Sequence, residues 1–248
     1  MPKADYVIHA AATTDASRYI VAGEEEKQNI LNGTINFCEL AKKYLKKSKI
    51  VYCSSGAVYG LQEEDTYLSE NDPLLDVSVL AQAKRPYALS KRDSEKVLQD
   101  CRNDINVSIA RCFAFFGNYL PRDQHFAIGN FIGQAQKGKD IVVNAKIKVF
   151  RSYMSADDLV FSLMTLMENS TLGELEIYNV GSDEKVELHD LAEIIAKKFN
   201  VNMVGLILDN TKSDTYIPSV KKLKSILGDY EFESIYRQLS ISCDKKLD

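Results

Sequence analysis

Several absences in this sequence limit the classes of protein that it can represent. No apolar run approaches the roughly eighteen residues that a membrane-spanning helix needs, and the N-terminus lacks a signal peptide's charged and then apolar order. An excess of positive charge is also missing, because 31 Lys and Arg stand against 35 Asp and Glu, for a net charge of −4. These absences predict a soluble protein whose partners are neither nucleic acid nor an anionic membrane.

Cysteine motifs are absent as well. The 5 cysteines stand at positions 38, 53, 101, 112 and 243, none in C-x-x-C spacing, and Cys53 and Cys112 lie in apolar, strand-like runs. We therefore expect reduced thiols and a cytosolic, cytoplasmic location. The chain shows no metal-ligand spacing, internal repeat or low-complexity tract, so we expect no metal site.

What is present is an alternation of strand-like and helix-like segments. The 248 residues, 45% of them apolar, suffice for one large or two modest domains with a sizeable core. Apolar periodicity predicts long helices over about 24–47 and from Pro86 to about 102, and a shorter one from His189. It predicts strands over about 5–12, 50–53, 105–113, 176–180 and 204–208, and a hairpin that pairs 141–143 with 148–150.

The stretch Tyr87-Ala88-Leu89-Ser90-Lys91 places a phenol and an ammonium four residues apart on one of these helices. Side chains at i and i+4 share a helix face. A free tyrosine, with a pKa of about 10, is a poor base, but a neighbouring positive charge favours the phenolate. We therefore expect Lys91 to lower the pKa of Tyr87, and an oxidised nicotinamide beside the pair would add a second positive charge.

A second stretch, Tyr52-Cys53-Ser54-Ser55-Gly56-Ala57-Val58-Tyr59-Gly60, delivers two hydroxyls from the end of a short apolar strand into a loop. Serines in this position usually cap turns. Together with Tyr87 and Lys91, however, they would provide a base, its electrostatic partner and a hydroxyl.

Five groups of residues occur here in the order found in one family: Val7-Ile8-His9-Ala10-Ala11-Ala12, Asn29 with Asn32-Gly33-Thr34, Ser54 to Gly60, Tyr87 with Lys91, and Arg151-Ser152-Tyr153. On these residues the chain, from residue 5 to about 220, resembles an extended short-chain dehydrogenase/reductase of the NAD-dependent epimerase/dehydratase family, whose members modify nucleotide sugars.

The resemblance implies an α/β fold, a doubly wound parallel sheet of the Rossmann type with a smaller C-terminal substrate lobe. It predicts a partial NAD-binding domain from residues 1–116 and 150–181, and a nucleotide-sugar lobe from 117–149 and 182–248. The strand at residue 5 matches the family's fourth strand. The family's first three strands and Gly-rich pyrophosphate loop, roughly 60 residues or more, are therefore expected to be missing from this sequence.

The resemblance also assigns the site residues. Tyr87, Lys91 and Ser55 would be catalytic. NAD, with NADP left open, would be held by Ala10, Ala11, Ala12, Asn29, Cys53, Ser54, Tyr87, Lys91 and Phe113. The substrate would be held by Ser55, Gly56, Ala57, Asn130 and Arg151, with Asn130 equally readable as a surface amide. A further diphosphate contact could come from Lys212, Tyr216 or Lys221, and the sequence does not decide among them.

The residues after Ser55 bear on the type of reaction. By resemblance, relatives that dehydrate carry an Asp-Glu pair there and relatives that decarboxylate carry a Glu, whereas this chain has Gly56-Ala57, neither of which transfers protons. We therefore expect an NAD-dependent nucleotide-sugar epimerase. The alternatives are a keto-sugar reductase, a dehydratase or decarboxylase of the same family, or a truncated product that cannot hold NAD. The two long helices predict a homodimer, again by resemblance.

Overall fold

The structure is a computed structural model that describes residues 3–13, 15–62, 66–124, 126–206 and 209–242. Its first part alternates strands and long helices: β1 (Tyr6–His9), α1 (Ala16–Tyr44), β2 (Lys49–Ser55), α2 (Arg85–Cys101) and β3 (Asn106–Cys112). Short 3-10 helices at Gly56–Tyr59, Val77–Val79 and Gln82–Lys84 lie between β2 and α2.

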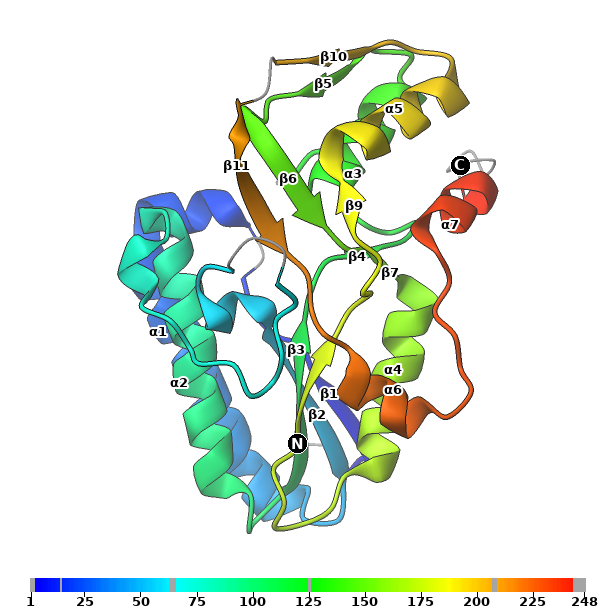
Figure 1. Ribbon diagram of the computed structural model, residues 1–248. Coiled ribbons are helices and arrows are strands. Elements are labelled where there is room, and N and C mark those ends of the chain that lie inside the picture. The colour runs from blue at the N-terminus through cyan, green and yellow to red at the C-terminus, as the bar shows by residue number, and fades with distance from the viewer. Residues whose placement is uncertain (1–2, 14, 63–65, 125, 207–208, 243–248) are drawn as a thin grey trace.

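The remainder of the chain consists of shorter elements (Figure 1). The helices are α3 (Ala127–Gln136), α4 (Ala156–Asn169), α5 (Leu188–Phe199), α6 (Lys221–Leu227) and α7 (Ile235–Ser242). The strands are β4 (Phe115–Phe116), β5 (Ile141–Val143), β6 (Ile147–Arg151), β7 (Met154–Ser155), β8 (Ile177–Val180), β9 (Val186–Glu187), β10 (Met203–Gly205) and β11 (Asp209–Tyr216).

A parallel sheet in the order β1-β2-β3-β8 forms the first lobe. Side chains on β2 alternate between its two faces, as the pleat of a strand requires. Ile50 and Tyr52 pack with Phe37 and Leu98 beneath α1 and α2, and Val51 packs on the other face beneath α4 and α6. The predicted class, an α/β fold with helices on both faces of a parallel sheet, is confirmed.

The second lobe packs α3 and α5 against short strand pairs (Figure 1). The predicted hairpin between 141–143 and 148–150 is wrong. Strand β5 pairs in parallel with β10, and β6 lies between β11 and β9. The apolar pattern of the two segments correctly indicated strands, but their partners come from more than thirty residues away, where local periodicity gives no information.

Helix α1 begins earlier than predicted, at Ala16 rather than near Glu24. Asp15 is its N-cap, and its side chain accepts a hydrogen bond from the Ser17 amide at 2.9 Å. The helix is interrupted at Ala22, which has φ −137° and ψ 41°. Because Ile20 and Val21, just before that kink, are 73% and 88% exposed, the amphipathic pattern is recognisable only after it.

Two further observations concern the sequence predictions. Leu223 and Leu227 of α6 and its N-cap residue Val220 pack with the core of the parallel sheet, although the predicted second lobe included residues 182–248. Cys38, Cys53, Cys101 and Cys112 are free thiols, and Cys243 lies outside the described residues, as do positions 207–208 of the predicted strand 204–208. Among the helices that the structure describes, none is both long enough and apolar enough to cross a membrane.

Candidate active site

Helix α2 presents a phenol, an ammonium and a carboxylate on one face. Tyr87, Lys91 and Glu95 are spaced four residues apart, and this face packs against the carboxyl end of β2. Pro86 lies in the first turn of the helix, as predicted, where its missing amide hydrogen costs nothing. The helix register therefore fixes which side chains meet the strand end.

Lys91 is held rigidly at this strand end. It is 2% exposed, and its Nζ donates to the carbonyl oxygen of Cys53 at 2.8 Å and to the hydroxyl of Tyr52 at 3.4 Å. Its Nζ also lies 5.9 Å from the ring centroid of Tyr87. Burial disfavours the ammonium, but the phenols of Tyr52 and Tyr87 outweigh it and raise the pKa of Lys91, so the side chain stays charged.

Ser55 closes β2 and caps the 3-10 helix that follows. Its Oγ accepts a hydrogen bond from the Ala57 amide at 3.2 Å, and its hydroxyl acts to lower the pKa values of the neighbouring phenols of Tyr87 and Tyr216. Tyr87, Lys91 and Ser55 therefore lie near one another at the carboxyl end of β2.

The net shift of the Tyr87 phenol is opposite to the expected one. Burial raises the pKa of Tyr87, whereas the charge of Lys91 and the hydrogen bond with Ser55 lower it, and burial is the larger effect. Lys91 thus acts on the pKa of Tyr87 in the expected direction, but burial, which the sequence does not reveal, outweighs it. Efficient phenolate formation requires additional positive charge near the ring.

A buried polar network, which the sequence analysis did not identify, fixes the strand end behind these residues. Glu95 accepts hydrogen bonds from the Ser54 hydroxyl at 2.5 Å and from Arg111 at 3.1 and 2.8 Å. Glu95 is 7% exposed and Arg111 is 4% exposed. The Arg111 guanidinium in turn lies 4.7 Å from the ring centroid of Tyr59, whose hydroxyl donates to Asn179 at 2.7 Å. The network therefore ties α2, β2, β3 and β8 together immediately beside Ser55.

Gly56 lies under two aromatic rings. A Cβ at this position would stand 2.5 Å from Cζ of Phe113 and 2.6 Å from the hydroxyl oxygen of Tyr216, closer than real Cβ atoms approach other atoms. The two rings stack with centroids 4.6 Å apart. Only glycine therefore fits at position 56 with these rings in place.

Replacing Gly56 with alanine is expected to lower the free energy of unfolding by about 1–3 kcal/mol, because the new methyl group must displace Phe113 or Tyr216. Chemical denaturation measures this change. Gly33→Ala is the matched control: a Cβ there meets nothing within 4 Å on helix α1, so we expect a gain of about 0.5–1 kcal/mol. Equal stability of the Gly56→Ala variant and the wild type would contradict the close packing.

The small residues Ala10 to Ala12 follow β1 and lie at the same carboxyl edge of the sheet as Cys53, Ser54 and Ser55. This edge is where open parallel sheets bind ligands. Asn29, by contrast, is exposed on α1, whereas its neighbour Ile30 is 5% exposed and faces inward. The assignment of Asn29 to the cofactor therefore stays a prediction by resemblance.

Arg151 and Asn130, which were predicted to hold the diphosphate, differ in how far their side chains are bound to other parts of the protein. Arg151 is engaged within the protein: its guanidinium donates to the carbonyl oxygens of Phe150 and Asp214 and, at 2.8 Å, to the Asp214 carboxylate. An anion would have to compete with that carboxylate. Asn130 lies on α3 in the second lobe and is partly exposed.

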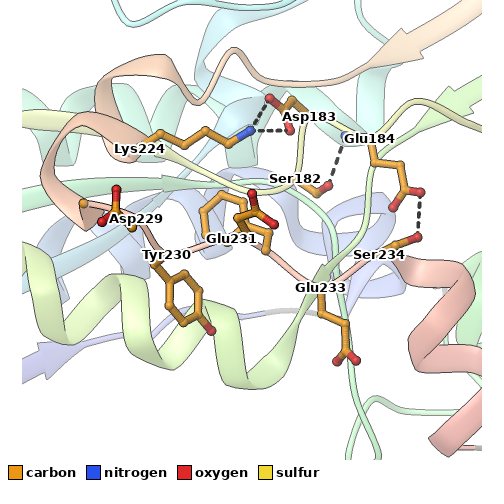
Figure 2. Close-up of a pocket in the computed structure, with 11 residues that line it drawn as sticks. Ser182, Asp183, Glu184, Lys224, Asp229, Tyr230, Glu231, Glu233 and Ser234 are labelled. Carbon is orange, nitrogen blue, oxygen red and sulfur yellow. Dashed lines mark hydrogen bonds and ion pairs between the residues drawn. The ribbon is translucent and has the colours of Figure 1, made fainter.

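A cavity of about 530 Å³ is lined by the segment 182–184, Lys224 and the segment 228–234 (Figure 2). Its walls carry more negative than positive charge, and Lys224 is paired with Asp183 at 2.8 Å. A second cavity of about 510 Å³ borders His189. Neither is lined by Tyr87, Lys91 or Ser55, and the acidic walls of the first disfavour a diphosphate.

Comparison with known proteins gives concordant matches. The family model described as "NAD dependent epimerase/dehydratase family" matches residues 1–181. UDP-glucuronic acid decarboxylase 5 of Arabidopsis thaliana is 29% identical over 210 residues, which cover 82% of this chain and 58% of that protein. The chain spans about half to three fifths of the length of the curated relatives that it matches first.

Solved structures share the fold at low sequence identity. A dTDP-glucose 4,6-dehydratase from Bacillus anthracis, in complex with NAD, superposes with a TM-score of 0.78 at 19% identity, covering 97% of this chain and 71% of that one. A UDP-glucose 4-epimerase from Thermotoga maritima, with UDP-glucose, superposes with a TM-score of 0.80 at 17% identity, covering 97% of this chain and 76% of that one.

Proposed function

Because the chain belongs to the NAD-dependent epimerase/dehydratase family, we propose that it is an enzyme that uses NAD to modify a nucleotide sugar, with Tyr87, Lys91 and Ser55 as catalytic residues. The observation that carries this proposal is the meeting of these three side chains at the carboxyl edge of the sheet. The similarity to a UDP-glucuronic acid decarboxylase, a dTDP-glucose 4,6-dehydratase and a UDP-glucose 4-epimerase supports the substrate class.

Each catalytic residue has a distinct task. Tyr87, as the phenolate, accepts the proton of a sugar hydroxyl at its Oη and later returns it. Lys91 stays charged and stabilises that phenolate. Ser55 hydrogen-bonds the sugar hydroxyl and shares with Tyr87 the proton that it gives up.

The residues present fit an oxidised nicotinamide cofactor. When bound, NAD supplies the hydride acceptor and the additional positive charge that Tyr87 requires. Cys53 and Tyr52 account for two of the three N–H groups of Lys91, which leaves one for a ligand. Ala10 to Ala12 carry only methyl side chains, so a ligand can approach the backbone at that edge. NADP remains an alternative to NAD.

Within this class we propose epimerisation. Neither Gly56 nor Ala57 transfers protons, and the space above Gly56 is filled by Phe113 and Tyr216. Decarboxylation is the second candidate, because a curated relative at 29% identity is a UDP-glucuronic acid decarboxylase. The predicted homodimer through α1 and α2 stays a prediction.

Incubating the full chain with NAD and a panel of UDP-, dTDP- and GDP-sugars is expected to yield an epimer of one substrate. Epimerisation leaves the mass unchanged, whereas decarboxylation of UDP-glucuronic acid removes carbon dioxide and dehydration removes water. Mass spectrometry with proton NMR of the sugar ring separates these products. Loss of carbon dioxide or water would overturn the epimerase assignment, and no product from a protein shown by calorimetry to bind NAD would overturn the proposed catalysis itself.

A further inference from the structure

Tyr19 is the side chain that the start of α1 directs into the protein. Between positions 16 and 25, all of which the structure describes, it is the only buried residue, at 7% exposed, whereas Ile20 and Val21 lie in solvent. Its ring lies edge-on against the ring of Tyr87, with the centroids 5.6 Å apart and the planes at 75°. The first turns of α1 therefore bury one side chain, and that side chain contacts the proposed catalytic base.

A polar cluster holds Tyr19 in this position. Its hydroxyl donates to the carbonyl oxygen of Thr13 at 2.7 Å, and the Thr13 hydroxyl donates to the carboxylate of Glu26. Glu26 is 1% exposed and also pairs with Arg18, the residue before Tyr19, at 2.5 Å. The cluster therefore joins the segment after β1 to both sides of the kink at Ala22.

Helices α1 and α2 run side by side, and they approach each other closely just after that kink (Figure 1). A Cβ at Gly23 would stand 2.8 Å from Cγ of Pro86, the residue that precedes Tyr87. Because position 23 has no side chain, the α1 backbone can pack against the proline. Tyr19, one turn earlier, then reaches the ring of Tyr87.

Tyr87 needs support from outside its own helix. Side chains of an α-helix lean toward its N-terminus and lie over the preceding turn. Tyr87 is the third residue of α2 and is partly exposed, so no full turn of that helix precedes it. A general base must stay within reach of the proton that it takes, and a misplacement of about 1 Å can cost about 10²-fold in rate.

We propose that Tyr19 is a positioning residue for catalysis, whose ring fixes the ring of Tyr87 so that the Tyr87 hydroxyl is directed at the substrate. This inference rests on the proposed catalytic role of Tyr87. It gives the start of α1 a task in the active site without requiring any contact between Tyr19 and the substrate.

Crystal structures of the full chain test the proposal without substrate or cofactor. Tyr19→Leu removes the aromatic edge, and we expect the Tyr87 hydroxyl oxygen to move by about 1 Å or more, or to divide between two conformers. Tyr19→Phe keeps the ring contact and loses only the bond to Thr13, so Tyr87 should stay within about 0.5 Å of its wild-type position. If Tyr19→Leu does not fold, Tyr19→Met takes its place, because a methionine fills irregular space without presenting an aromatic ring.

Steady-state kinetics on the substrate that the panel identifies give the second readout. Tyr19→Leu should lower kcat by about 10- to 100-fold while KM stays within about twofold, because the base moves and the sugar pocket does not. Tyr19→Phe should keep kcat within about threefold of the wild type. The control is Tyr178→Leu, which removes an equally buried ring, also 7% exposed, from the α4 and α6 side of the sheet. It should change neither kcat nor the position of Tyr87.

An unmoved Tyr87 in Tyr19→Leu overturns the proposal, and so does a displaced Tyr87 with unchanged kcat. A loss of kcat that Tyr178→Leu shares also overturns it, because such a loss comes from general destabilisation. Failure of the proposed enzyme function reads out differently, as an absence of product from the wild type. The position of Tyr87 in the Tyr19 variants then still decides whether Tyr19 fixes the ring.

Discussion

Replacing Tyr87 with phenylalanine is expected to lower the turnover number by about 10²–10⁴-fold, the usual contribution of a general acid–base residue. The substitution removes only the hydroxyl that hydrogen-bonds Ser55. The ring that stacks against Tyr19 remains, so we expect stability to change little. Steady-state kinetics on the substrate identified by the panel measure the loss.

The pH dependence separates a chemical role from a structural one. Since Tyr87 acts as a phenolate and burial raises its pKa, the wild-type rate should rise with pH as the phenol deprotonates. The Tyr87→Phe variant should lose this rise of the rate with pH, while its affinity for the nucleotide sugar stays close to that of the wild type. If Tyr87→Phe keeps the turnover number of the wild type, another residue must be the base.

Replacing Arg111 with methionine is expected to lower the free energy of unfolding by about 3–5 kcal/mol. Arg111 and Glu95 are 4% and 7% exposed, and their bidentate contact is 2.8 Å at its shortest. Without the guanidinium, the Glu95 carboxylate stays buried and keeps, among the residues that the structure describes, only the hydrogen bond from the Ser54 hydroxyl. Urea denaturation of the purified variants measures the effect.

The matched variants identify the cause of that loss. Combining Arg111→Met with Glu95→Gln removes the unpaired charge and keeps an acceptor for Ser54, so most of the lost stability should return. Lys224→Met breaks a half-exposed ion pair with Asp183 and should cost less than about 1 kcal/mol. If the double variant is as unstable as Arg111→Met alone, lost packing on Tyr59 rather than stranded charge explains the effect.

The sequence predicted those parts of the site that depend on local spacing. Tyr87 and Lys91 are four residues apart on a helix, and Ser55 directly ends an apolar strand, so their meeting follows from helix and strand geometry. The alternation of strands with helices likewise sufficed for the fold class.

What the sequence could not predict depends on contacts between distant segments. The pairing of β5 with β10 and the approach of Tyr216 to Gly56 both arise from the tertiary fold. Glu95 offered a weak signal, since it continues the face of Tyr87 and Lys91 by one turn, but its burial against Arg111 was not apparent. Asn29 was assigned by resemblance alone, and the helix turns its neighbour Ile30 inward instead.

The placement of Tyr216 at the end of β11 has a mechanical consequence. The strand is anchored in the sheet of the second lobe, while Gly56 belongs to the first, so a rotation between the lobes would change the distance from the Tyr216 hydroxyl to the Gly56 backbone directly. A hydroxyl contact weakens steeply with stretching and misalignment. The close approach of Tyr216 to the Gly56 backbone is therefore a contact between the two lobes, and the Gly56→Ala variant also probes how tightly they fit together.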